Sequence, residues 1–156
     1  MTIRPPTGAD HPQWRRLWEE YLHFYQQEPD PESTGHLWAR LLDDEDPVEG
    51  LIAESEGELV GIVHFFPHPD TWQAKPVCYL QDLYVGQPHR GRGLGRSLIQ
   101  EVVKRAAEAG WSHVYWQTAH DNARARRLYD QLTGGSTEFI VYQLDVTQVG
   151  SREANQ

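Results

Sequence analysis

Arginine and glycine alternate in one short stretch, and its residue types point most directly to chemistry. Its members are Arg90, Gly91, Arg92, Gly93, Leu94, Gly95 and Arg96. The three glycines can adopt backbone angles that other residues avoid, so consecutive amide N–H groups can converge on one cluster of ligand oxygens. The three arginines suit a ligand that carries several phosphate charges better than a single carboxylate. We call this stretch the anion cradle; the plain alternative is a glycine-rich connection flanked by solvated arginines.

The spacing within the anion cradle argues against two common phosphate-binding loops. A dinucleotide fingerprint, Gly-x-Gly-x-x-Gly counted from Gly91, needs its third glycine where this chain has Arg96. The Gly-Lys-Ser/Thr sequence of a P-loop is absent from the sequence. Neither nucleotide-binding fold is favoured, and the polyphosphate ligand stays open at this point.

The elements around the cradle follow from hydrophobic periodicity and turn residues. Strands are predicted at Thr2–Arg4, Leu51–Ala53, Leu59–Phe66, Pro76–Val85, His113–Gln117 and Phe139–Leu144. Helices are predicted from Ala9 to Gln26 with Asp10 as N-cap, from Ser33 to Leu42, from Gly93 to Gly110, and from Asp121 to Leu132. The third helix turns one face inward, formed by Leu94, Leu98, Ile99, Val102, Val103 and Ala106. Strands 76–85 and 113–117 would then run parallel through a right-handed crossover.

The first predicted helix carries an aromatic stripe, which mostly indicates a core face. Its end is followed by a proline-punctuated acidic loop. Tyr21, Tyr25 and Glu28 are therefore candidates for the edge of a substrate-binding mouth.

Other polar residues carry no metal-site or nucleophile prediction. Asp43–Asp46 is a run of carboxylates without the spacing of an EF-hand, and His64 and His68 lack a third ligand at a recognisable spacing. Cys78 lies in a predicted strand, where a cysteine is usually a small packed side chain. We predict no metal.

Length and composition suit one globular domain over 1–146 followed by a polar tail over 147–156. The net charge of −9 is uneven, since residues 1–75 hold 15 Asp and Glu against 5 Lys and Arg, and the remainder holds 8 against 9. This balance fits a polyanionic cofactor beside an amine-bearing substrate and disfavours nucleic acid, although acidic residues also simply confer solubility. No membrane-spanning run or secretion signal is apparent, so we expect a cytoplasmic protein.

Together these motifs resemble the GNAT superfamily of acetyl-CoA-dependent N-acetyltransferases. Arg90, Gly93 and Gly95 match the family's Arg/Gln-x-x-Gly-x-Gly/Ala signature, and Asn122 and Tyr129 match its downstream Asn-x-x-Ala-x-x-Leu-Tyr motif. The resemblance implies a mixed α/β (α+β) fold, with a mostly antiparallel sheet splayed at its middle and about four helices. Residues 78–85 and 114–118 look like the fungal histone and D-amino-acid acetyltransferase branch, with polyamine and thialysine acetyltransferases nearby.

The resemblance also implies roles for individual residues. The backbone of Leu83, Tyr84 and Val85 would hold the pantetheine arm of acetyl-CoA, residues 90–96 its pyrophosphate, and Asn122 the cofactor arm. Tyr129 would protonate the departing CoA thiolate, since a phenol keeps its proton at neutral pH. Trp116 joins the candidate substrate contacts.

The general base is left open by the sequence. Polyamine relatives carry a glutamate as candidate base where this chain has Gln81, which cannot accept a proton as a carboxylate does. Asp82 remains ionisable and able to orient a water, and backbone carbonyls with a water chain are the alternative.

The predicted function is direct transfer of an acetyl group to a primary amine of a small amine, an amino acid or a protein lysine. Two rivals are a non-catalytic acyl-CoA-binding sensor and an interaction domain whose arginines bind nothing in particular. A homodimer is plausible for the family.

Overall fold

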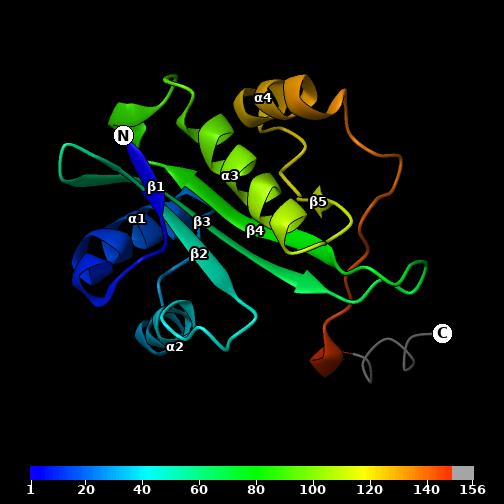
Figure 1. Ribbon diagram of the computed structural model, residues 1–156, viewed down its shortest axis with the longest axis horizontal. Coiled ribbons are helices and arrows are strands. Elements are labelled where there is room, and N and C mark those ends of the chain that lie inside the picture. The colour runs from blue at the N-terminus through cyan, green and yellow to red at the C-terminus, as the bar shows by residue number, and fades with distance from the viewer. Residues whose placement is uncertain (149–156) are drawn as a thin grey trace. The chain divides into compact units, whose positions relative to one another are not determined.

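A computed structural model describes residues 1–148, in two compact units that divide after Gln117 (Figure 1). The strands are β1 (Thr2–Arg4), β2 (Glu49–Ser55), β3 (Glu58–His68), β4 (Val77–Val85) and β5 (Val114–Tyr115). The α-helices are α1 (His11–Phe24), α2 (Pro31–Leu41), α3 (Leu94–Glu108) and α4 (Ala123–Thr133), with short 3₁₀ turns at Gly8–Asp10, Gln87–His89 and Val146–Gln148. The tail predicted over 147–156 lies, beyond Gln148, outside the described residues. No helix within 1–148 is long and apolar enough to cross a membrane.

The first unit contains one sheet in the order β1-β2-β3-β4-β5. Neighbouring strands are antiparallel except for β4 and β5, which are parallel. The predicted mixed fold with a mostly antiparallel sheet is confirmed. The parallel pairing of β4 with the strand after α3 is confirmed as well, although β5 is shorter than the predicted 113–117.

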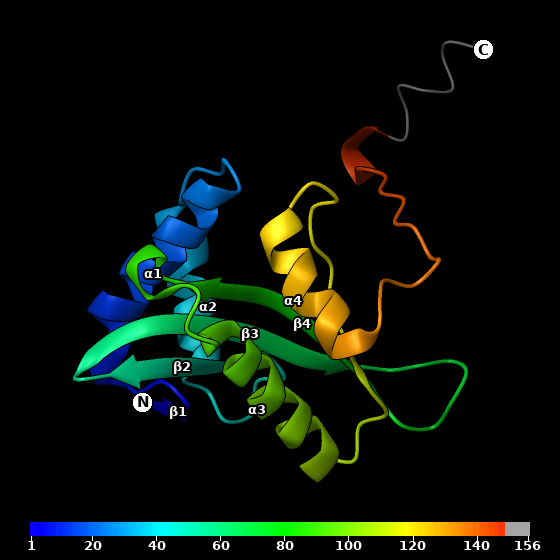
Figure 2. The ribbon, with the colours of Figure 1, turned by 90° about the horizontal axis from the view of Figure 1, so that it is seen from above.

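Helices cover both faces of this sheet, with α1 and α2 on one side and α3 on the other (Figure 2). Because both faces of β3 are covered, its residues from Leu59 to Phe65 are buried without a break. The tight β2–β3 connection uses left-handed backbone angles at Glu56 and Gly57, as two-residue hairpin turns require.

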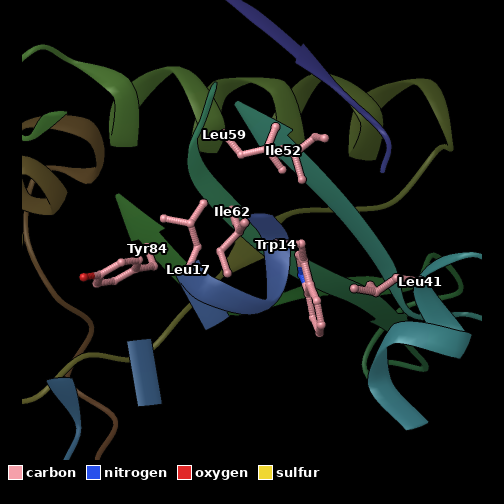
Figure 3. Packing of buried hydrophobic residues seen from close by; sticks show 7 residues of the cluster. All are labelled: Trp14, Leu17, Leu41, Ile52, Leu59, Ile62 and Tyr84. Carbon is pink, nitrogen blue, oxygen red and sulfur yellow. The ribbon is translucent and has the colours of Figure 1, made fainter. Parts of the chain in front are cut away.

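The core on the α1 side joins helix to sheet (Figure 3). Trp14 and Leu17 of α1 belong to one buried cluster with Ile62 of β3 and Tyr84 of β4. This packing fixes which face of α1 lies over β3 and β4, and so aims the aromatic residues that follow on that helix.

Two details of the helices differ from the prediction. Asp10 stands at the N-cap of α1 but makes no capping bond there, because its carboxylate accepts hydrogen bonds from the Thr7 amide and the Arg4 guanidinium. Val103 is half exposed at the border of the buried α3 stripe, whereas the other five predicted inward residues are buried.

In the second unit the strand predicted at Phe139–Leu144 does not form. The segment is exposed and has no regular secondary structure, with Tyr142 88% accessible. Its composition favours a strand, but a strand needs a partner ladder, and the described residues from 118 to 148 contain α4 and a 3₁₀ turn only.

Candidate active site

One edge of β4 is open along most of its length. β4 pairs with β5 only at Cys78 with Val114 and at Tyr79 with Tyr115. From Leu80 to Val85, no strand among residues 1–148 pairs with β4 on that side. This is the splayed sheet that the sequence resemblance implied.

The backbone N–H and C=O groups of successive strand residues point alternately to the two sides of the strand, which identifies those that face the open edge. The Gly86 amide donates to the Val60 carbonyl on β3 at 3.0 Å. Residues one and three positions earlier, Val85 and Leu83, therefore direct their N–H and C=O groups away from β3, toward the open edge. Tyr84 does not, since its backbone faces β3, and we correct its predicted backbone role accordingly.

The anion cradle follows β4 directly and leads into α3. Gly91 and Gly93 both have φ near +80°, a conformation that favours glycine, and Gly93 is the N-cap of α3. A Cβ built on Gly93 would meet no atom within 4 Å, so the space beside it is open. The first amides of α3 lack intrahelical acceptors by geometry, and the helix dipole adds positive potential. Gly95 lies within the first helical turn and needs no unusual angle.

The three cradle arginines differ in their surroundings. The Arg90 Nε donates to the Val85 carbonyl at 2.9 Å, and its guanidinium lies 5.6 Å from the Phe24 ring centroid and 5.2 Å from that of Tyr84. Arg90 thus ties the cradle to the end of β4 and to α1. Arg92 is exposed and Arg96 is half-buried in the first turn of α3.

A register shift in β4 separates two candidate catalytic residues. His64 pairs with Asp82 and Phe65 with Leu80, so Gln81 has no partner on β3. Such bulges re-aim side chains and occur often beside active sites. Here Gln81 is exposed, whereas Asp82 is buried under α1.

Asp82 is the centre of a hydrogen-bonded set that we call the Asp82 network, formed by Trp14, Tyr21, His64 and Asp82. The Tyr21 hydroxyl donates to Asp82 Oδ1 at 2.8 Å, and His64 Nδ1 lies 3.0 Å from Asp82 Oδ2. The Trp14 indole N–H donates to His64 Nε2 at 3.1 Å. Burial, and then the Asp82 charge, raise the pKa of Tyr21 above its ordinary value, so this phenol stays protonated.

A pocket of about 530 Å³ opens where α1, the end of β4 and the turn before the anion cradle meet. Its lining residues are Glu20, Phe24, Tyr84, Gln87, Pro88 and Arg90. The Tyr84 hydroxyl donates to Glu20 at 3.3 Å, and the rings of Tyr84 and Tyr21 lie 6.2 Å apart. A carboxylate and a guanidinium therefore share one concave site, and its lining residue Tyr84 lies near Tyr21.

The other candidate substrate contacts of the first unit do not line this pocket. Tyr25 packs edge-on against Tyr21 with centroids 5.1 Å apart. Glu28 is exposed in the loop between α1 and α2, and Trp116 is half-buried directly after β5.

Asn122 and Tyr129 belong to the second unit. The Asn122 side chain caps α4, accepting from the Ala125 amide at 3.4 Å. Tyr129 lies on the half-buried side of α4 with Ala125, Leu128 and Leu132.

Cys78 and the histidines fit no metal centre. Burial raises the pKa of the Cys78 thiol to about 12, which opposes a nucleophilic role. His68 bonds the Tyr115 hydroxyl at 2.8 Å, and no group of three His, Cys, Asp or Glu side chains within 1–148 is arranged to hold an ion.

The sequence prediction missed Trp14, Glu20 and His64 as site residues. The sequence offers His64 no third ligand at a recognisable spacing and no other partner nearby. Its partners come from α1 and β4, and no local spacing links them.

Comparison with known proteins places this geometry in a family. The acetyltransferase (GNAT) family matches residues 12–134. D-amino-acid N-acetyltransferase HPA3 of Saccharomyces cerevisiae is 35% identical over 145 residues, covering 92% of this chain and 89% of that protein. The uncharacterized N-acetyltransferase YhfO of Bacillus subtilis is 33% identical over 150 residues, covering 94% and 98%.

A solved structure shows the same fold. AAC(6')-Iy in complex with the bisubstrate analogue CoA-S-monomethyl-acetylneamine superposes with a TM-score of 0.79 at 20% identity, covering 92% of this chain and 97% of that one. The open β4 edge and the glycine turn at the start of α3 thus occur in a chain whose relatives transfer acyl groups to amines. The chain belongs to the acetyltransferase (GNAT) family and is an N-acetyltransferase.

Proposed function

We propose that acetyl-CoA is the acetyl donor, with its pantetheine arm along the open edge of β4 and its pyrophosphate at the anion cradle. The observation that carries this proposal is the continuity of the two features. Leu83 and Val85 direct backbone groups to the edge, and the left-handed glycines at the start of α3 follow within ten residues. Family members use acetyl-CoA, and AAC(6')-Iy was solved with a CoA-containing analogue.

The chemistry is direct attack of a neutral amine on the thioester carbonyl. The Val85 amide, directed to the open edge, is suited to stabilise the oxyanion. Tyr129 is the proposed acid for the leaving thiolate, and Asn122 the contact to the cofactor arm. No covalent enzyme intermediate is needed, and the protonated state of the buried Cys78 thiol agrees with that.

The proposed acceptor is a small amine, with a free amino acid as the first choice over a protein lysine. The pocket lined by Tyr84 offers the Glu20 carboxylate, which suits the ammonium of such an acceptor. The name of the relative HPA3 points to the same class. The homodimer and the cytoplasmic location stay predictions from the sequence.

An amine panel tests this function. CoA release from acetyl-CoA is followed with D- and L-amino acids, diamines, aminoglycosides and a lysine peptide. We expect turnover with amino acids above the others. CoA binding without turnover on any amine would favour the non-catalytic sensor instead.

The same assay tests the acid. Tyr129→Phe is expected to lower kcat by about 100-fold, the usual contribution of a general acid. Tyr142→Phe is the matched control, since Tyr142 is an exposed tyrosine of the same unit. Full activity of Tyr129→Phe removes that residue from the role.

A further inference from the structure

The direction of the hydrogen bonds in the Asp82 network follows from its members. An indole N–H can only donate, so His64 Nε2 must accept from Trp14. The His64 proton then sits on Nδ1 and is donated to Asp82 Oδ2. Trp14 therefore fixes the His64 tautomer, and His64 fixes the Asp82 carboxylate.

The members of the Asp82 network differ in how far they are buried. The side chains of His64 and Asp82 are 3% and 12% accessible, and Trp14 is buried. Tyr21 is the one member that is not buried, and its ring lies 6.2 Å from that of Tyr84, which lines the pocket. Of the two side chains that hydrogen-bond to Asp82, Tyr21 is the partly exposed one and His64 is buried.

Stability alone gives a weak reason for this arrangement. A buried carboxylate is costly, and an apolar replacement of similar volume is often as stable. The network also lies one residue past the β4 bulge and beside the open edge where the donor is proposed to lie. The Asp82 carboxylate accepts hydrogen bonds from His64 and Tyr21, and only Tyr21 is partly exposed. This arrangement fits a group that receives a proton.

We propose that Tyr21 and Asp82 form a relay that removes the proton of the acceptor ammonium, with His64 and Trp14 as positioning residues. The N–H bond of the ammonium breaks as its proton passes to the Tyr21 oxygen, while the Tyr21 proton passes to Asp82 Oδ1. The products are a neutral amine and a neutral Asp82, and Tyr21 is unchanged. After acetyl transfer the proton leaves by the same route. This inference rests on the proposed acetyl transfer and names its base.

The surroundings of the relay contain few other titratable groups. Tyr25 of α1 and Tyr79 of β4 lie close enough to Tyr21 to contribute to its raised pKa, and Glu20 and Arg90 interact with Tyr84. Because its pKa is raised, Tyr21 stays protonated and does not act as a phenolate base. It can pass a proton on only by giving up its own proton as it accepts another.

The test compares two acceptors of different basicity. An ordinary amino acid must lose a proton at pH 7, whereas 2,2,2-trifluoroethylamine is already neutral there. In Tyr21→Phe and Asp82→Asn we expect kcat/KM to fall about 100-fold with the amino acid at pH 7. We expect little loss with the fluorinated amine, and a loss with the amino acid that shrinks as pH rises toward the amine's own pKa.

Tyr115→Phe is the matched control, because its hydroxyl bonds His68 at the same 2.8 Å as Tyr21 bonds Asp82. It should keep wild-type kinetics with both amines. CoA affinity equal to wild type verifies that each variant is folded; if Asp82→Asn does not fold, Tyr21→Phe alone decides.

Two results overturn the relay. Equal losses on both amines at every pH, with wild type active, would mean that the network only holds the structure. No turnover of any amine by wild type would refute the proposed acetyl transfer, and the relay with it.

Discussion

The Asp82 network includes a residue of β4, the anion cradle follows the C-terminal end of the same strand, and the two are built in opposite ways. The cradle uses backbone amides, two left-handed glycines and an exposed arginine. The network uses four side chains, of which three are buried, and its hydrogen bonds join α1, β3 and β4.

The difference matches two different tasks. A polyphosphate needs many donors that stay open to solvent until it binds, and a turn before a helix supplies them at little cost. A group that accepts a proton needs few contacts, held in one geometry and shielded from water. The contrast between an open backbone site and a closed side-chain site can be tested in each of these two regions.

Thiol labelling should show the largest contrast. With a pKa of about 12, the Cys78 thiol has little thiolate until the pH approaches that value, so it should stay unreactive at pH 8. A cysteine placed in the cradle by Arg92→Cys is exposed, and about a thousandfold faster reaction at pH 8 follows from its ordinary pKa. CoA should protect the introduced thiol. Rapid labelling of native Cys78 would show instead that the β4 interior opens.

A pair of glycine substitutions should show a smaller effect. Gly93 and Gly57 both have φ near +80° and open space where a Cβ would stand. Alanine at either position costs about 1 kcal/mol of folding free energy. Only Gly93→Ala should weaken CoA binding, by about tenfold, because only that backbone lies at the proposed pyrophosphate site. Equal CoA affinity of the two variants would remove the cradle from that role.

The cradle could be predicted from the sequence because it is local. Arg90 to Arg96 are adjacent, and their glycine spacing needs no knowledge of other elements. The β2–β3 turn at Gly57 and the cap at Asn122 are local features of the same kind.

The network could not be predicted, because its bonds join positions 14, 21, 64 and 82. His64 faces Asp82 only through the β3–β4 register, and that register shifts at Gln81. The strand predicted at 139–144 failed for a related reason. Propensity describes a segment, whereas a strand also requires a partner that the segment does not specify.

The CoA dissociation constant of Asp82→Asn, measured by calorimetry beside wild type, tests the division between the two regions most directly. If the network handles the amine proton and the cradle holds the cofactor, the constant stays within twofold of wild type while kcat/KM for the amino acid at pH 7 falls about 100-fold. An Asp82→Asn variant that binds CoA as weakly as Gly93→Ala would contradict the account.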